Sequence, residues 1–120
     1  MSNWDVAFHV AYAEELDGAP ADVRRKVMAM ALLLKQFGPE LGRPHCDTLN
    51  GSRHKNMKEL RFTVPGGVWR VAFAFDPLRC AVLLVGGNKA GKNGANERKF
   101  YNNLIAIADA RFDEHLGDPS

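Results

Sequence analysis

The chain has 120 residues, of which 46% are hydrophobic and 25% charged, with a formal net charge of +2. This composition excludes a disordered chain, and the length suits one domain with one core. The longest apolar run, Met28 to Leu34, is too short to span a bilayer, and residues 1–5 do not resemble a signal peptide. We therefore expect one cytoplasmic domain over residues 1–120, without a membrane partner, in which Cys46 and Cys80 are reduced thiols.

The first elements alternate between strand and helix signals. Residues 4–9 alternate apolar and polar side chains, as a half-buried strand does. Residues 11–16 predict a short helix, and residues 20–37 predict a longer one that ends before Gly38. The apolar residues of the longer helix recur at helical spacing: Val23, Val27, Met30, Ala31, Leu34 and Phe37. Residues 42–56, rich in Gly, Pro, His, Asn and Ser, predict a long basic loop.

Three strand signals follow in quick succession. Residues 59–64 and 69–75 alternate apolar and polar side chains around a turn, and residues 80–85 form an apolar run, which together predict an antiparallel meander. Residues 86–94 predict a loop rich in glycine and lysine. Residues 96–116 predict a final helix with one apolar face, made by Phe100, Leu104, Ile107, Ala108 and Phe112. This order of elements predicts an α+β domain.

The positive charge is concentrated in the middle of the chain. Between Arg43 and Lys99 there are eleven basic and four acidic residues, a net charge of +7, whereas the rest of the chain carries −5. Like charges gathered in one stretch raise the local potential and attract polyanions. The middle of the chain is therefore a candidate nucleic-acid surface, with an unliganded solvated face as the alternative.

One segment resembles a phosphate-binding loop of nucleotide hydrolases without completing it. Gly86 and the pair Gly91-Lys92 match most of that pattern, but Asn93 stands where a hydroxyl should bind Mg²⁺. The segment also ends an antiparallel meander, and too little chain follows for a nucleotide-binding parallel sheet. We do not expect nucleotide hydrolysis, although the glycine N–H groups and lysines of this loop suit a phosphate.

Metal ligands are scarce in the sequence. His45, Cys46 and His54 share one predicted loop, but no further histidine or acidic residue stands at ligand spacing. Lone histidines are more often polar surface or core residues than ligands. We therefore expect neither a metal nor another cofactor.

Arg61 and Arg70 lie on the two arms of the predicted hairpin, about equally far from its turn. Cross-strand neighbours on one face lie about 5 Å apart, and two guanidinium groups at that distance repel each other unless an anion lies between them. RNA cleavage by its 2′-hydroxyl needs such cations, a base and an acid. Alternatively, both arginines face solvent and pair with Glu59 or Asp76. A further candidate is Lys58, on the same strand as Arg61. Four more follow the third strand of the meander: Lys89, Lys92, Arg98 and Tyr101.

Several segments in this order resemble the core of RelE/ParE toxins, and most of all their HigB-like branch, which includes phage-encoded relatives. The segments are Met57-Lys58-Glu59-Leu60-Arg61-Phe62, Trp69-Arg70-Val71-Ala72-Phe73-Ala74-Phe75 and Leu83-Leu84-Val85-Gly86-Gly87-Asn88-Lys89. Residues 37–44 and parts of the tail between Phe100 and Leu116 also resemble that branch. The resemblance therefore covers nearly the whole chain.

The resemblance implies a RelE-like fold: an antiparallel sheet of about four strands, two N-terminal helices packed on one face, and a C-terminal helix. It also implies a basic cleft on the face opposite the helices. The expected partners are a helix-turn-helix antitoxin, the ribosome and mRNA. The expected activity is ribosome-dependent mRNA cleavage that inhibits translation, carried out by Arg, Lys, His and Tyr side chains without a metal.

The resemblance and the chemistry of the side chains together predict roles for individual residues. The expected catalytic residues are Arg61, Arg70, Lys89, Lys58, Tyr101 and His54, and the expected RNA-binding residues are Arg53, Lys55, Lys92 and Arg98. Arg61 and Arg70 would hold the scissile phosphate, since a guanidinium donates two hydrogen bonds to phosphate oxygens. Lys89 would protonate the leaving oxygen or complete the cationic site. Either Lys58 or His54 would act as the base.

Two other functions fit the same fold. ParE toxins inhibit DNA gyrase without cutting RNA, and a weak relative could bind only its antitoxin. A fold does not separate such functions. The set of Arg61, Arg70, Lys89 and Tyr101 favours the nuclease.

Overall fold

The structure of the protein, a computed structural model, describes residues 4–117. Every helix and strand predicted from the sequence is present, and the fold is α+β. The elements in chain order are β1 (Asp5–Phe8), α1 (Val10–Asp17), α2 (Ala21–Phe37), a 3₁₀ turn (Gly38–Glu40), β2 (Cys46–Thr48), β3 (Met57–Val64), β4 (Gly67–Phe75), β5 (Cys80–Asn88) and α3 (Gly94–Leu116).

The sheet has five strands in the order β1-β5-β4-β3-β2. The pairs β2–β3, β3–β4 and β4–β5 are antiparallel, whereas β1 is parallel to β5. The sequence predicted about four strands because β2 lies within residues 42–56, which were expected to form a loop. This strand has three residues and pairs Cys46 with Leu60. Such a short segment has too few residues to show the alternation typical of a strand.

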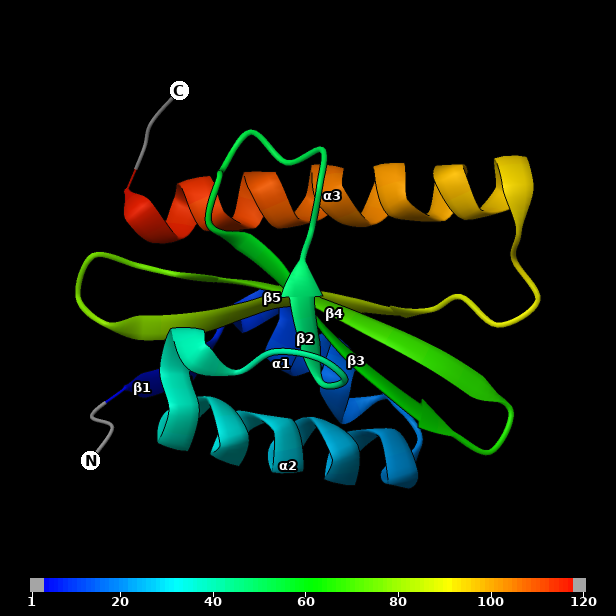
Figure 1. Cartoon of the computed structure of the whole chain (residues 1–120), viewed down its shortest axis with the longest axis horizontal. Coiled ribbons are helices and arrows are strands. Elements are labelled where there is room, and N and C mark those ends of the chain that lie inside the picture. Colours follow the sequence, from blue (N-terminus) through cyan, green and yellow to red (C-terminus); the bar gives the residue numbers. More distant parts are fainter. Residues whose placement is uncertain (1–3, 118–120) are drawn as a thin grey trace.

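The sheet separates the helices into two layers, with α1 and α2 on one face and α3 on the other (Figure 1). Successive residues of β3 and β4 point alternately toward the two helix layers. Leu60 and Phe73 belong to the core beneath α2, whereas Met57 and Ala72 belong to the core beneath α3. The implied arrangement, with a basic cleft on a face free of helices, is therefore wrong in one respect, because α3 covers that face.

The apolar stripe of α2 is buried as predicted from Val23 to Leu34, but not at its end. Phe37 is 43% exposed because the chain turns at Gly38, which has a positive φ of 56°. The Trp4 ring packs directly against Gly38, so that a Cβ there would lie 2.4 Å from it. Ile107, expected on the apolar face of the last helix, is 40% exposed.

Strand β5 extends three residues beyond the predicted end at Val85. Gly86 pairs with Val71 and Gly87 pairs with Arg70, so both glycines belong to the sheet. The glycines were predicted to lie in a loop because they carry no side chain to show alternation. Their place in the strand also rules out a phosphate-loop conformation at Gly86 and Gly87.

Two further features of the chain concern the membrane and the cysteines. Within residues 4–117, no helix is both long enough and apolar enough to cross a membrane. Cys46 and Cys80 are free thiols, and burial raises the pKa of both.

Candidate functional site

Arg61 and Arg70 are direct cross-strand partners in the β3–β4 pair, as the hairpin predicted. Both side chains lie on the face covered by α3, because they alternate with Leu60 and Val71, which face α2. Arg70 is only 6% exposed, and Arg61 is partly buried. Such a pair of buried guanidinium groups requires a counter-charge.

Glu59 supplies that counter-charge. Arg61 Nη1 donates a hydrogen bond to Glu59 Oε2 at 2.8 Å, and Arg70 Nε lies 3.8 Å from Glu59 Oε1. Glu59 is 5% exposed, and its Oε1 is buried without a hydrogen-bond partner. The alternative interpretation was that both arginines face solvent and pair with Glu59 or Asp76. Both arginines do contact Glu59, but they do not face solvent. Asp76 instead lies 2.7 Å from His115.

Helix α3 adds a tyrosine and a second carboxylate to this group. Arg70 Nε donates to the Tyr101 hydroxyl at 3.2 Å, and Lys89 Nζ lies 5.9 Å from the centroid of the Tyr101 ring. Lys89 Nζ also donates to Glu97 Oε2 at 2.7 Å. This hydrogen bond and the charge of Lys89 hold the pKa of Glu97 below its usual value.

We call these six residues the cationic cluster: Glu59, Arg61, Arg70, Lys89, Glu97 and Tyr101. Four of the six residues predicted as catalytic are therefore in one place. Three cations face two carboxylates and a phenol hydroxyl, so the cluster carries one excess positive charge. Such a cluster can hold a phosphate and place a donor group beside its oxygens.

Two cavities border the cluster, each lined by two of its members. Arg61 and Arg70 line a cavity of 400 Å³ that also contains Lys26, Arg43 and His45 and has no acidic lining residue. Tyr101 lines a cavity of 720 Å³ between residues 50–53 and α3. The second cavity also contains the carboxylates of Glu97 and Asp109, so the first cavity is the more positive of the two.

Lys58 and His54 do not join the cluster. Lys58 stands two residues before Leu60 in β3, so the two side chains lie on the same face of the sheet. Leu60 belongs to the core beneath α2, as does Phe73, the cross-strand partner of Lys58. The Lys58 side chain therefore lies on the α2 face. His54 bonds Asp113 Oδ1 at 2.8 Å. Asp113 is twelve residues beyond Tyr101 on α3, or about 18 Å along the helix. The structure therefore gives neither residue access to a phosphate held by Arg61 and Arg70.

The four predicted RNA-binding residues are spread over the surface around α3. Arg53 pairs with Asp113 and, with Arg98, lines the cavity beside Tyr101. Lys92 lines a third cavity on the other side of α3. Lys55 is exposed and lines none of these cavities.

Glu59 and Glu97 are the cluster members that were not predicted as site residues. Glu59 stands two positions before Arg61, so the period of a strand places both on one face. It lies on the face of the sheet that α3 covers, and α3 comes from the end of the chain. Glu97 stands one helical turn before Tyr101, a spacing that could have indicated it.

Residues 4–117 contain no group of three or more His, Cys, Asp or Glu side chains that could hold a metal ion. His45 and His54 lie in different places, one beside Arg61 and the other on Asp113.

This architecture is that of the RelE-like toxins. The chain is similar to a free-state mutant of the E. coli toxin RelE, with a TM-score of 0.57 and 10% identity over 87% of this chain and 95% of that chain. A model of the family described as Phage derived protein Gp49-like (DUF891) matches residues 14–113. The chain belongs to this Gp49-like family.

Two relatives come from Mycobacterium tuberculosis (strain ATCC 25618 / H37Rv). The chain is 45% identical over 105 residues to a protein named as the toxin HigB2, covering 84% of this chain and 49% of that relative. It is 47% identical over 96 residues to one named as the toxin HigB3, covering 79% of this chain and 78% of the relative. The chain thus spans about half the length of the first relative. The HigB-like resemblance is confirmed.

Proposed function

We propose that this protein is the toxin of a type II toxin–antitoxin pair and that it cleaves mRNA on the ribosome, which inhibits translation. The observation that carries the proposal is the contact of Arg61, Arg70, Lys89 and Tyr101 in one cluster on a RelE-like fold. The names of the two mycobacterial relatives support the toxin role. We further propose that residues 1–120 act as one toxin domain in the cytoplasm, with a helix-turn-helix antitoxin as the partner.

The proposed reaction is attack of an RNA 2′-hydroxyl on the adjacent phosphate. Arg61 and Arg70 hold the phosphate and stabilise its additional negative charge in the transition state. Both arginines keep their charge at any working pH. Their contact with Glu59 fixes the two guanidinium groups before the substrate binds, so little reorganisation is needed.

Lys89 and Tyr101 complete the site on the α3 side. The Lys89 ammonium donates a proton to the leaving 5′-oxygen or adds its charge to the phosphate site, once a phosphate replaces Glu97 as its partner. Tyr101 keeps Arg70 in place through its hydroxyl. Since Lys58 and His54 lie elsewhere, the base is a carboxylate of the cluster: Glu97, released from Lys89 by the phosphate, takes the 2′-hydroxyl proton. The bond from phosphorus to the 5′-oxygen then breaks, and a 2′,3′-cyclic phosphate forms.

The test is cleavage of a ribosome-bound message by purified protein. Arg61→Ala, Arg70→Gln and Lys89→Ala should each slow cleavage by roughly a thousandfold, because each removes one charged transition-state contact. The matched control is Arg24→Ala, at an exposed arginine of α2 whose side chain hydrogen-bonds only to the Ala19 carbonyl among the described residues. Circular dichroism checks that each variant is folded.

If all three folded variants cut as fast as the wild type, the catalytic assignment is wrong. A second readout separates the alternative functions. Mapping RNA 5′ ends after a short pulse of expression should reveal new ends at in-frame codon positions. DNA damage with intact messages would point to gyrase inhibition, and neither effect would point to a relative that only binds its antitoxin.

A further inference from the structure

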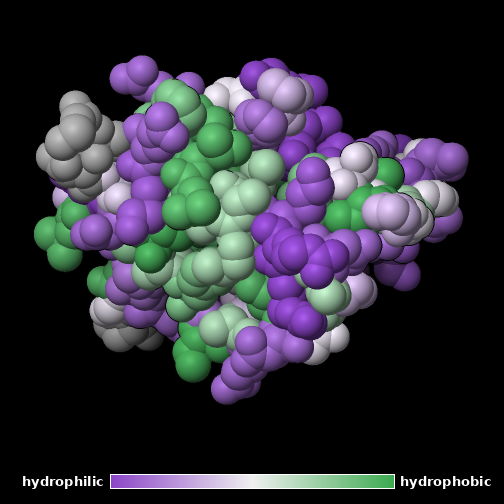
Figure 2. Space-filling view, turned by 90° about the horizontal axis from the view of Figure 1, so that it is seen from below, coloured by the Kyte–Doolittle hydropathy of each residue, from purple (hydrophilic) through white to green (hydrophobic). Residues whose placement is uncertain are grey.

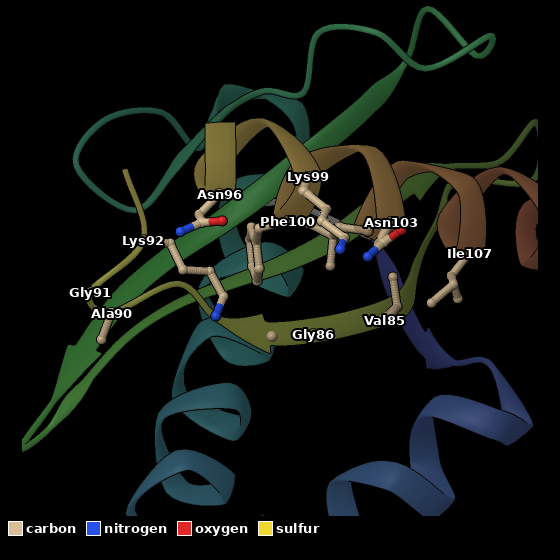
Figure 3. Close-up of a pocket in the computed structure, with 12 residues that line it drawn as sticks. Val85, Gly86, Ala90, Gly91, Lys92, Asn96, Lys99, Phe100, Asn103 and Ile107 are labelled. Carbon is tan, nitrogen blue, oxygen red and sulfur yellow. The ribbon is translucent and has the colours of Figure 1, made fainter. Parts of the chain in front are cut away.

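A third cavity, of 580 Å³, lies between the end of β5 and the first half of α3 (Figure 3). Lys92, Asn96, Lys99, Phe100 and Asn103 line it from the loop and the helix. The backbone of β5 closes it from below. This cavity lies on the opposite side of α3 from the one that contains Tyr101, and none of its residues belongs to the cationic cluster.

The cavity is open because of the way β5 is built. Strand β1 pairs with β5 only as far as Leu83, so it does not cover the edge of residues 84–88. At Gly87 a Cβ would lie 2.8 Å from Cε1 of Phe100. Glycine at this position therefore lets the Phe100 ring approach the strand, where it forms one side of the cavity.

The lining combines three kinds of groups that bind nucleotides. Phe100 offers an aromatic ring, Asn96 and Asn103 offer amide donors and acceptors, and Lys92 and Lys99 offer positive charge. The lining contains no acidic residue, and within residues 4–117 neither lysine forms an ion pair. Aromatic rings bind unpaired bases by stacking, amides bind base edges, and lysines bind phosphates.

The cavity begins next to the cationic cluster. Arg61 pairs with Arg70 and Arg70 pairs with Gly87, so the three residues form one row across β3, β4 and β5. Neighbouring strands are about 4.8 Å apart, which places the cavity within one nucleotide of the arginines. The rings of Phe100 and Tyr101 are also in contact, with centroids 5.3 Å apart.

We propose that this cavity is a subsite that binds the unpaired base of a nucleotide adjacent to the phosphate held by Arg61 and Arg70. The base stacks on Phe100, Asn96 and Asn103 bind its edge, and Lys92 and Lys99 neutralise the next phosphate. The proposal rests on the proposed RNA cleavage and adds a base-selecting site to it. An acidic protein segment is the other kind of ligand that two lysines would suit, but it would use neither the ring nor the amides.

The test is nuclear magnetic resonance of the full chain with trinucleotides of 2′-O-methyl ribose, which lack the attacking hydroxyl. Saturable shifts are expected at Gly86, Gly87, Phe100 and Asn103, with different affinities for the four homopolymers. Phe100→Leu keeps the apolar volume but removes the aromatic ring, so the affinity should fall roughly tenfold. Lys35→Gln, on the exposed side of α2, is the control and should change nothing.

Three results would overturn the subsite: no saturable binding up to millimolar trinucleotide, shifts confined to the cationic cluster, or equal affinity of Phe100→Leu and the wild type. Shifts of the same residues by a hexaglutamate peptide but not by RNA would assign the cavity to a protein ligand. Cleavage assays separate this failure from that of the proposed function. If Phe100→Leu cuts the same codons at the wild-type rate while Arg70→Gln does not cut, only the subsite is wrong.

Discussion

The two long helices cover opposite faces of the same sheet but are held there by different forces. Helix α2 packs through buried apolar side chains, and within residues 4–117 no side-chain hydrogen bond or ion pair joins it to the sheet. Helix α3 also has an apolar side, but it is tied down by polar pairs along its length: Lys89–Glu97, Arg70–Tyr101, Ser52–Asp109, Glu15–Arg111, His54–Asp113, His9–Glu114 and Asp76–His115.

The difference extends to the core itself. The buried charged residues of the described chain are Glu59, Arg70, Asp109 and Asp113, and all belong to the α3 side. Apolar residues would fill the same space without the cost of removing charge from water. The α2 face is therefore an apolar core, whereas the α3 face keeps buried charges that stability does not require. On the outside, α2 exposes Met28 and Leu32, and an apolar band crosses the molecule when it is viewed from the α2 side (Figure 2).

The largest effect is expected from a charge beneath α2. Leu34 is fully buried, and burial of such a side chain contributes roughly 1.5–3 kcal/mol, to which Leu34→Asp adds an unpaired charge. This variant should be unfolded or insoluble. Leu32→Asp, two residues away but 67% exposed, is the matched control. Thermal melting by circular dichroism is the measurement, and equal melting of both variants would contradict the assigned core.

An intermediate effect is expected at the centre of the α3 face. Glu59→Gln leaves Arg61 and Arg70 close together without their counter-charge. The free energy of unfolding should fall by about 3 kcal/mol, as when one partner of a buried ion pair is removed. Glu40→Gln, at an exposed position, should have no effect. Urea denaturation measures both, and an unchanged midpoint for Glu59→Gln would show that the arginines do not depend on this carboxylate.

The smallest effect should depend on pH. Burial alone would raise the pKa of Asp76, but hydrogen bonds from His115 and from the N–H groups of Cys80 and Leu78 outweigh it, so the pKa is below its usual value. A depressed carboxyl pKa stabilises the fold above the unfolded value, about 3.9, and that contribution is lost as the pH falls through the folded pKa.

Asp76→Asn should therefore lower stability at pH 7, and the difference from the wild type should shrink below about pH 4. Denaturant unfolding at several pH values is the measurement, and Asp17→Asn, exposed at the end of α1, is the control. A difference that stays constant with pH would exclude the carboxylate charge as its source.

The same comparison explains how far the sequence alone could go. The α2 face was predictable because an apolar stripe and alternating strands encode burial locally. The pairing of Arg61 with Arg70 followed from the turn between two strands. Lys58 was assigned to the same site although it is three residues from Arg61 in a strand of period two, which places the two side chains on opposite faces.

The parts that could not be predicted depend on contacts between distant segments. The contact of Tyr101 with Arg70 and the position of His54 both follow from where α3 crosses the sheet. No local pattern encodes that crossing. The cavity beside Phe100 was missed for a related reason, since Gly86 and Gly87 were interpreted as a loop and not as the bare end of a strand.

The buried contact between Glu59 and Arg70 has a consequence for the evolution of this protein. Arg61 shares the same carboxylate, so an apolar replacement must include all three residues to remove every desolvated charge, and such exchanges are often neutral or stabilising. The change would also remove both arginines that we propose as phosphate ligands. On the proposed function, loss of toxicity and gain of stability are therefore reachable through the same three positions, as in other trade-offs between activity and stability. Inactive descendants of this chain should be found with all three positions apolar more often than with only one.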